Sequence, residues 1–253
     1  MNTSTTRSAR PPTAPGSALA PKGNPAGLRP KLLQTATALF RSKGFAATSV
    51  DALCAAAGVT KGAFFHYFPS KDALGVATAE FWSETTGAMF AGAPFHEHAD
   101  PLTRVLSYID FRSELIAGNP EEFSCVAGTL VQEAFMTSPA IRAACDASIS
   151  GHAATLEADL DAALSQHGVT GVSAADLALH MQAVLQGAFI LAKAKGDAAI
   201  ARGSITHLRR YFELLFKVDT SQPNVNKGKV SKGKANKGKV KQAKVNKNER
   251  SAT

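Results

Sequence analysis

The 253-residue chain has few cysteines, and these are widely spaced at Cys54, Cys125 and Cys145. An odd number without the close spacing of zinc ligands implies neither a disulfide framework nor a metal site. The N-terminus lacks the apolar core of a signal peptide, and no apolar run approaches the roughly 20 residues of a membrane-spanning helix. These absences predict a protein of a reducing cytoplasm with no membrane partner, no metal and no cofactor.

The chain also lacks segments with the alternating polar and apolar pattern of a β-strand. Apolar residues recur instead at helical spacing through residues 28–217, which predicts an all-α fold of about nine helices. Thr48, Thr60 and Ser70 are predicted N-caps, and Gly58 is a predicted helix stop. The predicted helices cover residues 31–44, 49–57, 60–67, 71–89, 101–117, 121–136, 139–167, 173–196 and 204–216.

Acidic residues are absent from residues 1–30, which carry four basic side chains. Residues 219–253 carry ten basic and two acidic side chains, mostly in a degenerate five-residue repeat, "VNKGK VSKGK ANKGK VKQAK VNKNE". Between these tails, residues 31–75 have a net charge of +3 and residues 76–218 a net charge of −7. A basic head on an acidic body indicates that the head faces a polyanion.

The stretch "AGVTKGAFFHYFPSKDAL" at residues 57–74 carries the strongest functional signal. It completes three short predicted helices, with a turn at Gly58, in a helix-turn-helix pattern. Phe64 and Phe68 share one helical face and can pack inward, whereas the three rings between them cannot all be buried on so short a helix. Exposed rings beside lysines suit contacts with phosphates and groove edges, and the alternative is a hydrophobic hinge between two helical domains.

The segment "LFRSKGFAATSVDALCAAAGVTKGAFFHYFPSKDAL" resembles the DNA-binding domain of TetR-family transcriptional repressors, along about 45 residues without a gap. The glycines, the Lys-Gly pair, the aromatic run and the Phe-Pro-Ser-Lys ending fall in register with the family pattern. The resemblance implies that residues of the third helix lie in the DNA groove and that their neighbours hold phosphates. The groove residues would be Thr60, Lys61 and Gly62, and the phosphate contacts Thr48, His66, Tyr67 and Lys71. Phe65 stands where the family usually has Tyr, so only a ring contact with the sugar backbone or a thymine methyl remains.

Composition and resemblance together divide the chain into four segments. Residues 1–27 are rich in Pro, Ala, Ser, Thr and Gly and are predicted to be disordered, as is the Lys-rich tail at 218–253. Residues 28–75 are the predicted helix-turn-helix domain, and residues 76–217 a helical effector-binding and dimerisation domain. The tail either adds sequence-independent attraction to DNA or serves as a solubilising terminus.

By the same resemblance, the protein is a ligand-responsive repressor that binds a palindromic double-stranded DNA operator as a homodimer and is released by an unknown small-molecule effector. The last two predicted helices would form a four-helix dimer interface, although an intramolecular core stripe has the same pattern. The predicted dimer face is Leu177, Met181, Leu185, Gly187, Ala188, Leu208, Tyr211, Phe212 and Leu215. The candidate pocket residues are Trp82, Phe111, Phe123, Cys125, Gln132, Met136, His152 and Phe189.

Two smaller patterns have both a functional and a structural interpretation. Cys125 lies near a predicted helix start, where amides can lower the pKa of a thiol, so it is either an electrophile sensor or a small buried apolar residue. His96 and His98, beside Glu97 and Asp100, could bind a metal, but two histidines do not complete a site and a solvated loop is the simpler interpretation.

Two other functions compete with the repressor. A helical enzyme is not supported, because the sequence shows no phosphate-binding glycine loop, complete set of metal ligands or nucleophile with a base. We therefore predict no enzyme activity. An architectural, nucleoid-associated protein would keep the DNA partner and rely on the Lys-rich tail, without an operator or an effector.

Overall fold

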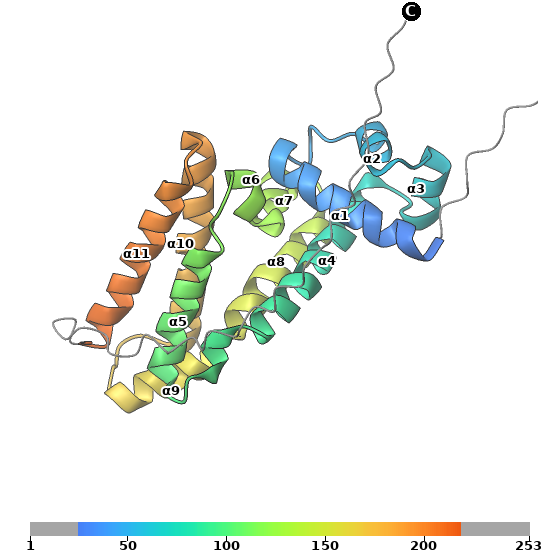
Figure 1. The fold of residues 1–253 in the computed structure, drawn as a ribbon. Coiled ribbons are helices and arrows are strands. Elements are labelled where there is room, and N and C mark those ends of the chain that lie inside the picture. Colours follow the sequence, from blue (N-terminus) through green and yellow to red (C-terminus); the bar gives the residue numbers. More distant parts are fainter. Residues whose placement is uncertain (1–24, 219–253) are drawn as a thin grey trace, which may run out of the picture. The chain divides into compact units, whose positions relative to one another are not determined.

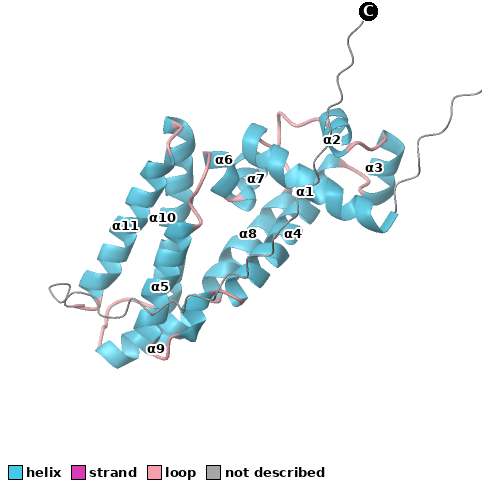
Figure 2. Cartoon of the chain, viewed as in Figure 1, coloured by secondary structure: helices cyan, strands magenta, loops and turns pink. Residues whose placement is uncertain are grey.

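Across residues 25–218, which the computed structural model describes, the chain forms eleven α-helices, one short 3-10 helix and no strand (Figures 1 and 2). The all-α prediction is therefore confirmed. The predicted disordered tails lie outside the described residues except at their inner ends, where the prediction is corrected: residues 25–27 form the first turn of α1, and the Val218 N–H donates to the Glu213 carbonyl at 2.8 Å. The elements are α1 (Pro25–Lys43), α2 (Val50–Ala57), α3 (Lys61–Tyr67), α4 (Lys71–Ala91), η1 (Pro94–Glu97), α5 (Pro101–Glu114), α6 (Pro120–Phe123), α7 (Val126–Ala134), α8 (Pro139–Ala154), α9 (Glu157–His167), α10 (Ala174–Lys195) and α11 (Ala198–Leu215).

Side-chain caps set the helix starts in the head, residues 28–75. Thr60 and Ser70 cap α3 and α4 as predicted, and their oxygens accept a backbone N–H of the first turn at 3.1 and 3.0 Å. The capping prediction for Thr48 is wrong, because Ser49 caps α2. Thr48 is fully buried, and its hydroxyl donates to the Gly44 carbonyl at 2.6 Å. Its role is to close the loop before α2.

Two of the nine predicted helices are each broken in two, which raises the count to eleven. The segment 121–136 divides into α6 and α7 because the backbone is extended at Ser124 and Cys125, and the Cys125 thiol caps α7. The segment 139–167 divides into α8 and α9 at Thr155, whose hydroxyl donates to a backbone carbonyl of the preceding turn. Neither break contains a glycine or proline, so the sequence pattern alone does not mark it.

Two hydrophobic cores organise the helices. The first joins α1, α2 and α3 to the start of α4, to α7 and to the first half of α8, with Phe40, Leu53 and Phe64 fully buried in it. The second lies among the end of α4, α5, α9, α10 and α11, around Tyr108 and Phe212. Because α4 and α8 pack side by side and contribute to both, the head shares its core with the body (Figure 1).

Within the described residues, α10 is the one helix long and apolar enough to cross a membrane by length and composition, with a mean hydropathy of 1.3. The expectation that no such segment exists is therefore corrected. Eight of its 22 residues are buried in the protein, so one side of the helix belongs to the core. Its neighbour α11 is longer than predicted, because it begins directly after the capping residue Asp197 and not at residue 204.

The predicted dimer face on α10 and α11 is mostly the chain's own core. Six of its nine residues are buried within a single chain and are not available to a partner: Leu177, Met181, Leu185, Ala188, Leu208 and Phe212. Gly187 and Leu215 are partly buried, and Tyr211 is exposed. A different set of large apolar side chains on these two helices is exposed: Leu179, Ile190, Leu191 and Leu214.

Candidate nucleic-acid interface and internal cavity

A tight turn places the start of α3 at the surface. Gly58 has a φ of 62°, the left-handed conformation that glycine adopts without steric cost, and it ends α2. Thr60 then caps α3, which has only seven residues and ends before Pro69. In this arrangement Thr60, Lys61 and Gly62 are all exposed at the first turn of the helix.

The five consecutive rings divide between core and solvent, as the sequence predicts. Phe64 and Phe68 are 0% and 3% exposed and belong to the first core, whereas Phe65 is 50% exposed. His66 is also exposed, and Tyr67 is partly buried. The Phe65 ring meets the Phe64 ring edge to face, with 5.1 Å between centroids, so the buried ring supports the exposed one. A hinge explains the two buried rings but not the exposed pair.

Two lysines flank α3, and both have partners. Lys61 Nζ lies 2.8 Å from Asp51 Oδ1 in an exposed ion pair, and the hydrogen bond between them raises the pKa of Lys61. Such a pair contributes little to stability and can exchange its carboxylate for a phosphate. Lys71 Nζ donates to the Phe45 carbonyl at 3.0 Å and lies 4.3 Å from that ring, so it ties α4 to the loop after α1.

Seven of the eight predicted DNA-contacting residues therefore lie on or beside α3 with some exposure. Five are exposed, namely Thr60, Lys61, Gly62, Phe65 and His66, and two are partly buried, Tyr67 and Lys71. The eighth, Thr48, corrects the prediction, because its buried hydroxyl already donates to a backbone carbonyl and does not face solvent.

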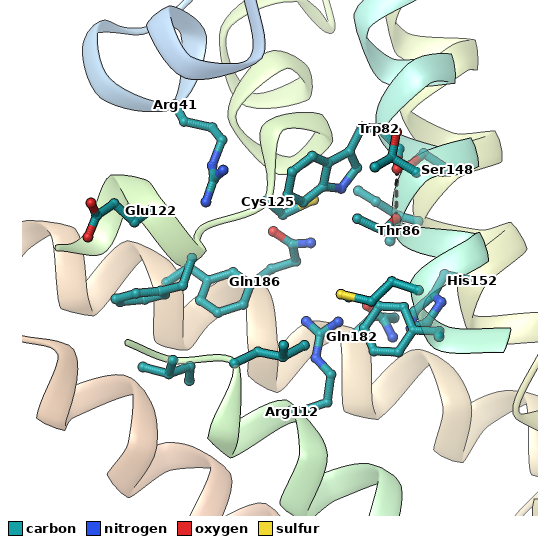
Figure 3. Close-up of a pocket in the computed structure, with 18 residues that line it drawn as sticks. Arg41, Trp82, Thr86, Arg112, Glu122, Cys125, Ser148, His152, Gln182 and Gln186 are labelled. Carbon is teal, nitrogen blue, oxygen red and sulfur yellow. Dashed lines mark hydrogen bonds between the residues drawn. The ribbon is translucent and has the colours of Figure 1, made fainter. Parts of the chain in front are cut away.

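A cavity of about 330 Å³ lies between the two cores (Figure 3). Its lining comes from α1, α4, α5, the α6–α7 segment, α8 and α10. Much of the wall is apolar, with Trp82, Phe90 and Phe189 as its largest rings. This size, and an apolar wall with a few polar groups, are typical of small-molecule sites.

Five of the predicted pocket residues line this cavity: Trp82, Phe123, Cys125, His152 and Phe189. The other three do not. The Phe111 ring packs against those of Phe90 and Phe95. Gln132 lines a second cavity of about 310 Å³ beside the end of α1. Met136 is 77% exposed, because α7 ends two residues before it.

Several polar residues that line the cavity were not predicted from the sequence, because no spacing pattern links residues on separate helices. Arg41 Nε and Nη2 are buried without a hydrogen-bond partner, as is Gln182 Nε2. The Arg41 guanidinium lies 5.1 Å from the Trp82 ring, and that of Arg112 lies 5.1 Å from the Phe90 ring. Burial lowers the pKa of Arg41. The polar lining residues that were not predicted are Arg41, Thr85, Thr86, Arg112, Glu122, Ser148, Gln182 and Gln186.

His152 is a neutral group on the cavity wall. Burial, aided by the charge of Arg112, lowers the pKa of His152 to about 4. Its Nε2 shares a hydrogen bond of 2.9 Å with the Tyr108 hydroxyl, and its ring lies 4.4 Å from that of Phe90. Near neutral pH it therefore offers the cavity hydrogen bonding and ring surface, and no charge.

The two smaller sequence patterns have structural partners. Cys125 is partly buried between the two cavities, and its Sγ accepts the Gly128 N–H at 3.4 Å. His96 Nε2 lies 3.1 Å from the Phe90 carbonyl oxygen. Within residues 25–218, no group of three or more His, Cys, Asp or Glu is placed to hold a metal. The electrophile-sensor hypothesis for Cys125 stays a prediction.

Family models match both halves of the described chain. The model for bacterial regulatory proteins of the tetR family matches residues 32–78, which contain α2, α3 and the exposed rings. The model for the C-terminal domain of LmrA/YxaF-like transcriptional regulators matches residues 101–202, which contain α5 to α10. The helix-turn-helix head and the helical body thus each have a family counterpart.

Individual relatives agree with these models. The transcriptional regulator AcuR of Cereibacter sphaeroides is 28% identical over 127 residues, which are 50% of this chain and 54% of AcuR. The regulator EthR of Mycolicibacterium smegmatis is 32% identical over 108 residues, or 43% of this chain and 48% of EthR. The chain thus spans about half the length of these curated relatives.

Solved structures share the fold over most of the chain. A TetR-family regulator from Agrobacterium tumefaciens has a TM-score of 0.66 at 24% identity, covering 74% of this chain and 98% of that one. The reduced form of NemR from E. coli has a TM-score of 0.63 at 25% identity, covering 73% and 96%. Together with the helix-turn-helix arrangement of α2 and α3, the two family models show that the chain belongs to the TetR family of transcriptional regulators.

Proposed function

We propose that this protein is a repressor that binds a palindromic operator as a homodimer and is released by a small-molecule effector held in the 330 Å³ cavity. It would act in the cytoplasm, on the DNA of the nucleoid. The observation that carries the proposal is the cavity's position between the two cores, with one wall from α1 of the head. A ligand there contacts the helix that supports α2 and α3.

On DNA, the first turn of α3 would enter the major groove. Lys61 would exchange Asp51 for a base edge or a phosphate, and the Thr60 and Gly62 backbone would approach closely because no bulky side chain intervenes. Side chains beside this turn that are exposed or partly buried would contact the sugar-phosphate backbone, namely Phe65, His66, Tyr67 and Lys71. Thr48 has a supporting role in this proposal, since it shapes the loop before α2.

A second apolar face on α10 supports a homodimer. One face of α10 is buried in the second core, while Leu179, Ile190 and Leu191 on its other side are 49%, 46% and 51% exposed. On α11, which packs against α10, Tyr211 and Leu214 are 39% and 68% exposed. Exposed apolar patches of this kind favour protein–protein contacts. A second copy of the two helices would complete a four-helix interface.

The dimer is tested by placing a charge on this face. Leu214→Glu and Leu191→Glu should convert a dimer to a monomer in sedimentation velocity and weaken operator binding strongly, because two half-sites are no longer held together. Met136→Glu is the matched control, since Met136 is equally apolar and 77% exposed but lies outside α10 and α11. A monomeric wild type, or dimers in all three variants, would contradict this interface.

The operator is tested by selecting fragments from random DNA in the presence of competitor DNA. A repressor should retain a short inverted repeat whose half-sites lie about one helical turn, roughly 34–36 Å, apart. The selection should give the same site with residues 219–253 removed, since the described unit ends at Val218. If the protein retained DNA only with the Lys-rich tail present, and without sequence preference, the result would favour the architectural alternative.

A further inference from the structure

The Arg41 side chain enters the cavity from the last turn of α1 with an unoccupied binding edge (Figure 3). Its Nε and Nη2 atoms are buried and have no hydrogen-bond partner. These two nitrogens form one side of the planar guanidinium, the side that binds a carboxylate with two parallel hydrogen bonds. Burying a cation without such a partner is unfavourable, so the arrangement favours a ligand that supplies one.

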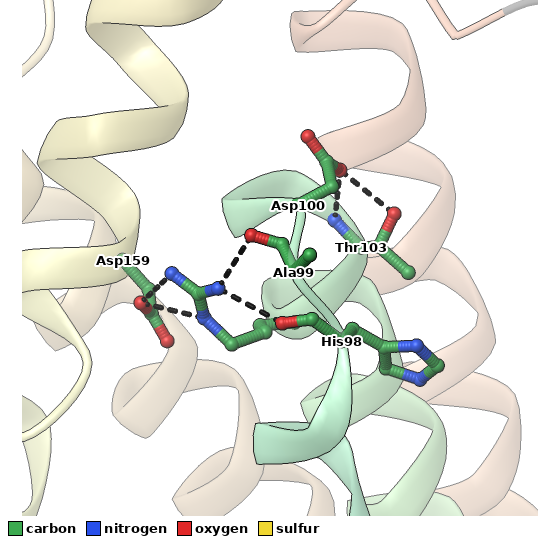
Figure 4. Close-up of polar contacts among 6 residues, drawn as sticks. His98, Ala99, Asp100, Thr103 and Asp159 are labelled. Atoms are coloured by element: carbon green, nitrogen blue, oxygen red, sulfur yellow. Dashed lines mark hydrogen bonds and ion pairs between the residues drawn. The ribbon is translucent and has the colours of Figure 1, made fainter.

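Another arginine in the same protein shows what that edge binds. Arg104 Nε and Nη2 both donate to one carboxylate oxygen, Asp159 Oδ1, at 2.9 and 2.7 Å (Figure 4). Its Nη1 donates to the carbonyls of His98 and Ala99, both at 2.9 Å. Arg104 is thus fully engaged, whereas the equivalent edge of Arg41 faces a cavity instead of a carboxylate.

Two carboxylates, those of Glu122 and Glu121, act on the charge of Arg41, and Glu133 lines the second cavity, which Arg41 also lines. Glu122 also lines the cavity, but its Oε2 accepts the Asn119 N–H at 2.7 Å in the cap of α6. Glu133 Oε2 accepts the Ala46 N–H at 2.7 Å. Their charges still act on this region, yet no ion pair to Arg41 is formed within the described residues.

The far side of the cavity adds a second cation. Arg112 projects from α5 and lies 5.1 and 6.0 Å from the Phe90 and Phe189 rings, without an ion pair among the described residues. Figure 3 shows Arg41 and Arg112 pointing into the cavity from opposite sides.

We propose that the effector is a small apolar molecule with a single carboxylate, which binds the Nε and Nη2 edge of Arg41 within the field of Arg112. Its apolar body would lie against Trp82, Phe90 and Phe189, and the volume of about 330 Å³ limits it to a small molecule. A neutral ligand would leave the Arg41 edge empty, and a cationic one would be repelled by both guanidinium groups. The release step below rests on the proposed function, but the binding step does not.

The position of Arg41 connects the ligand to the head. Arg41 belongs to α1, which packs on α2 of the helix-turn-helix. Its carbonyl accepts a hydrogen bond from Lys193 Nζ on α10 at 3.0 Å. A carboxylate held by the Arg41 side chain therefore acts on the junction between α1 and α10, and a ligand can shift the head only through such differential contacts.

The binding step is tested without DNA, because Trp82 is the only tryptophan and lies beside Arg41. Octanoate, 1-octanol and octylamine share one apolar chain and differ in the charge of the head group. Titrations followed by Trp82 fluorescence should give octanoate an affinity about tenfold or more above that of the other two. Equal affinity for octanol, or tighter binding of octylamine, overturns the proposal.

Variants locate the charge recognition. Arg41→Gln and Arg112→Gln should each reduce the preference for octanoate over octanol to within about threefold, whereas Arg142→Gln, an exposed arginine on α8, should leave it unchanged. If Arg41→Gln does not fold, the affinities of the three ligands for the wild type and for Arg112→Gln still test whether the cavity prefers a carboxylate. An unchanged preference in both cavity variants overturns the assignment.

The release step uses the operator. Octanoate should release wild-type protein from DNA, and the same concentration should not release Arg41→Gln, although that variant still binds DNA. Octanoate binding in the fluorescence assay without release overturns the role of Arg41 as the connection to the head. Absence of an operator would refute the proposed function and leave the binding result standing.

Discussion

The surface of α3 and the 330 Å³ cavity use the same kinds of side chain in opposite settings. On α3, Lys61 and Phe65 are exposed, and the lysine already has a solvated carboxylate beside it. At the cavity, Arg41 holds two buried donors without partners, and the imidazole of His152 is kept neutral. The first set is exposed to solvent, whereas the buried nitrogens of Arg41 have no hydrogen-bond partner within the described residues.

This difference has a consequence for recognition. An exposed cation gives up little when it moves from water to a phosphate, so the head is suited to attract any duplex and to discriminate by shape and base edges. A buried donor that lacks a partner lowers the stability of the empty protein, and a matching ligand recovers that free energy. The cavity is therefore the more selective of the two surfaces.

The largest expected effect comes from two neighbouring rings on α3. Phe64→Ala should lower the free energy of unfolding by about 3–5 kcal/mol, because it leaves a void in a core where Phe64 is 0% exposed. Phe65→Ala should change stability by less than about 1 kcal/mol and weaken DNA binding, because half of that ring is exposed. Urea unfolding and DNA titration of both variants measure the contrast.

Phe65→Tyr adds only a hydroxyl and serves as the matched gain-of-contact variant. It should tighten DNA binding by the hydrogen bond that this chain lacks at the position where the family usually has tyrosine. If Phe65→Ala destabilised the fold as much as Phe64→Ala, the division of the rings between core and DNA surface would be refuted.

The next effect, in the cavity, depends on pH. The pKa of His152 is about 4 in the folded protein, and near 6.5 in the unfolded chain. Above pH 6.5 the ring is neutral in both states, and between about 6.5 and 4 only the unfolded chain binds the proton. The free energy of unfolding should therefore fall by up to about 3 kcal/mol as the pH falls through this window.

A substitution isolates this contribution. His152→Gln keeps a hydrogen-bonding side chain beside Tyr108 and should unfold with a smaller loss of stability between pH 7 and pH 4.5 than the wild type. His98→Gln, at an exposed histidine, is the control and should retain the wild-type pH dependence. Identical pH profiles for all three proteins would mean that His152 is not held neutral by burial.

The head was predictable because its determinants are contiguous. The cap at Thr60, the glycine turn and the spacing of Phe64 and Phe68 all lie within a dozen residues, and each acts through local geometry. Thr48 was misassigned because Thr48 and Ser49 are both capable caps, and only packing decides that the threonine turns inward. The helix breaks near Cys125 and Thr155 were missed for a similar reason, since neither carries a strong breaker.

The cavity was predictable only in part, because its lining is assembled from six separate regions of the chain. Aromatic residues in the body were reasonable candidates, and Trp82 and Phe189 do line it. Arg41 was missed because it belongs to the head, and its role follows from the core that head and body share. The apolar periodicity of α10 likewise did not reveal which of its two apolar faces is buried.

A smaller effect is expected from the exposed cation of α3. Lys61→Ala should weaken DNA binding about tenfold and reduce the slope of log affinity against log salt by about 1, because one phosphate or base contact is lost. Asp51→Asn should strengthen binding modestly, because it removes the carboxylate that competes for Lys61 at 2.8 Å. Arg142→Ala, an exposed cation on α8, is the control in the same salt titration. Weaker binding by Asp51→Asn would show that the ion pair positions Lys61 for DNA.

The smallest effect tests the cavity in the absence of any ligand, by making one substitution at two arginines. Arg104→Met removes an occupied guanidinium and leaves Asp159 unpaired, so it should lower the free energy of unfolding by about 1 kcal/mol. Arg41→Met removes buried donors that have no partner and keeps an apolar contact with Trp82, so it should raise that free energy by about 1 kcal/mol. Urea unfolding of ligand-free protein gives both values. If both substitutions lowered the free energy of unfolding, Arg41 would already have hydrogen-bond partners in the ligand-free protein. Its Nε and Nη2 atoms would then not be free to bind a carboxylate. If Arg104→Met lowered the free energy of unfolding and Arg41→Met raised it, Arg41 would be a charged group that serves binding and lowers stability.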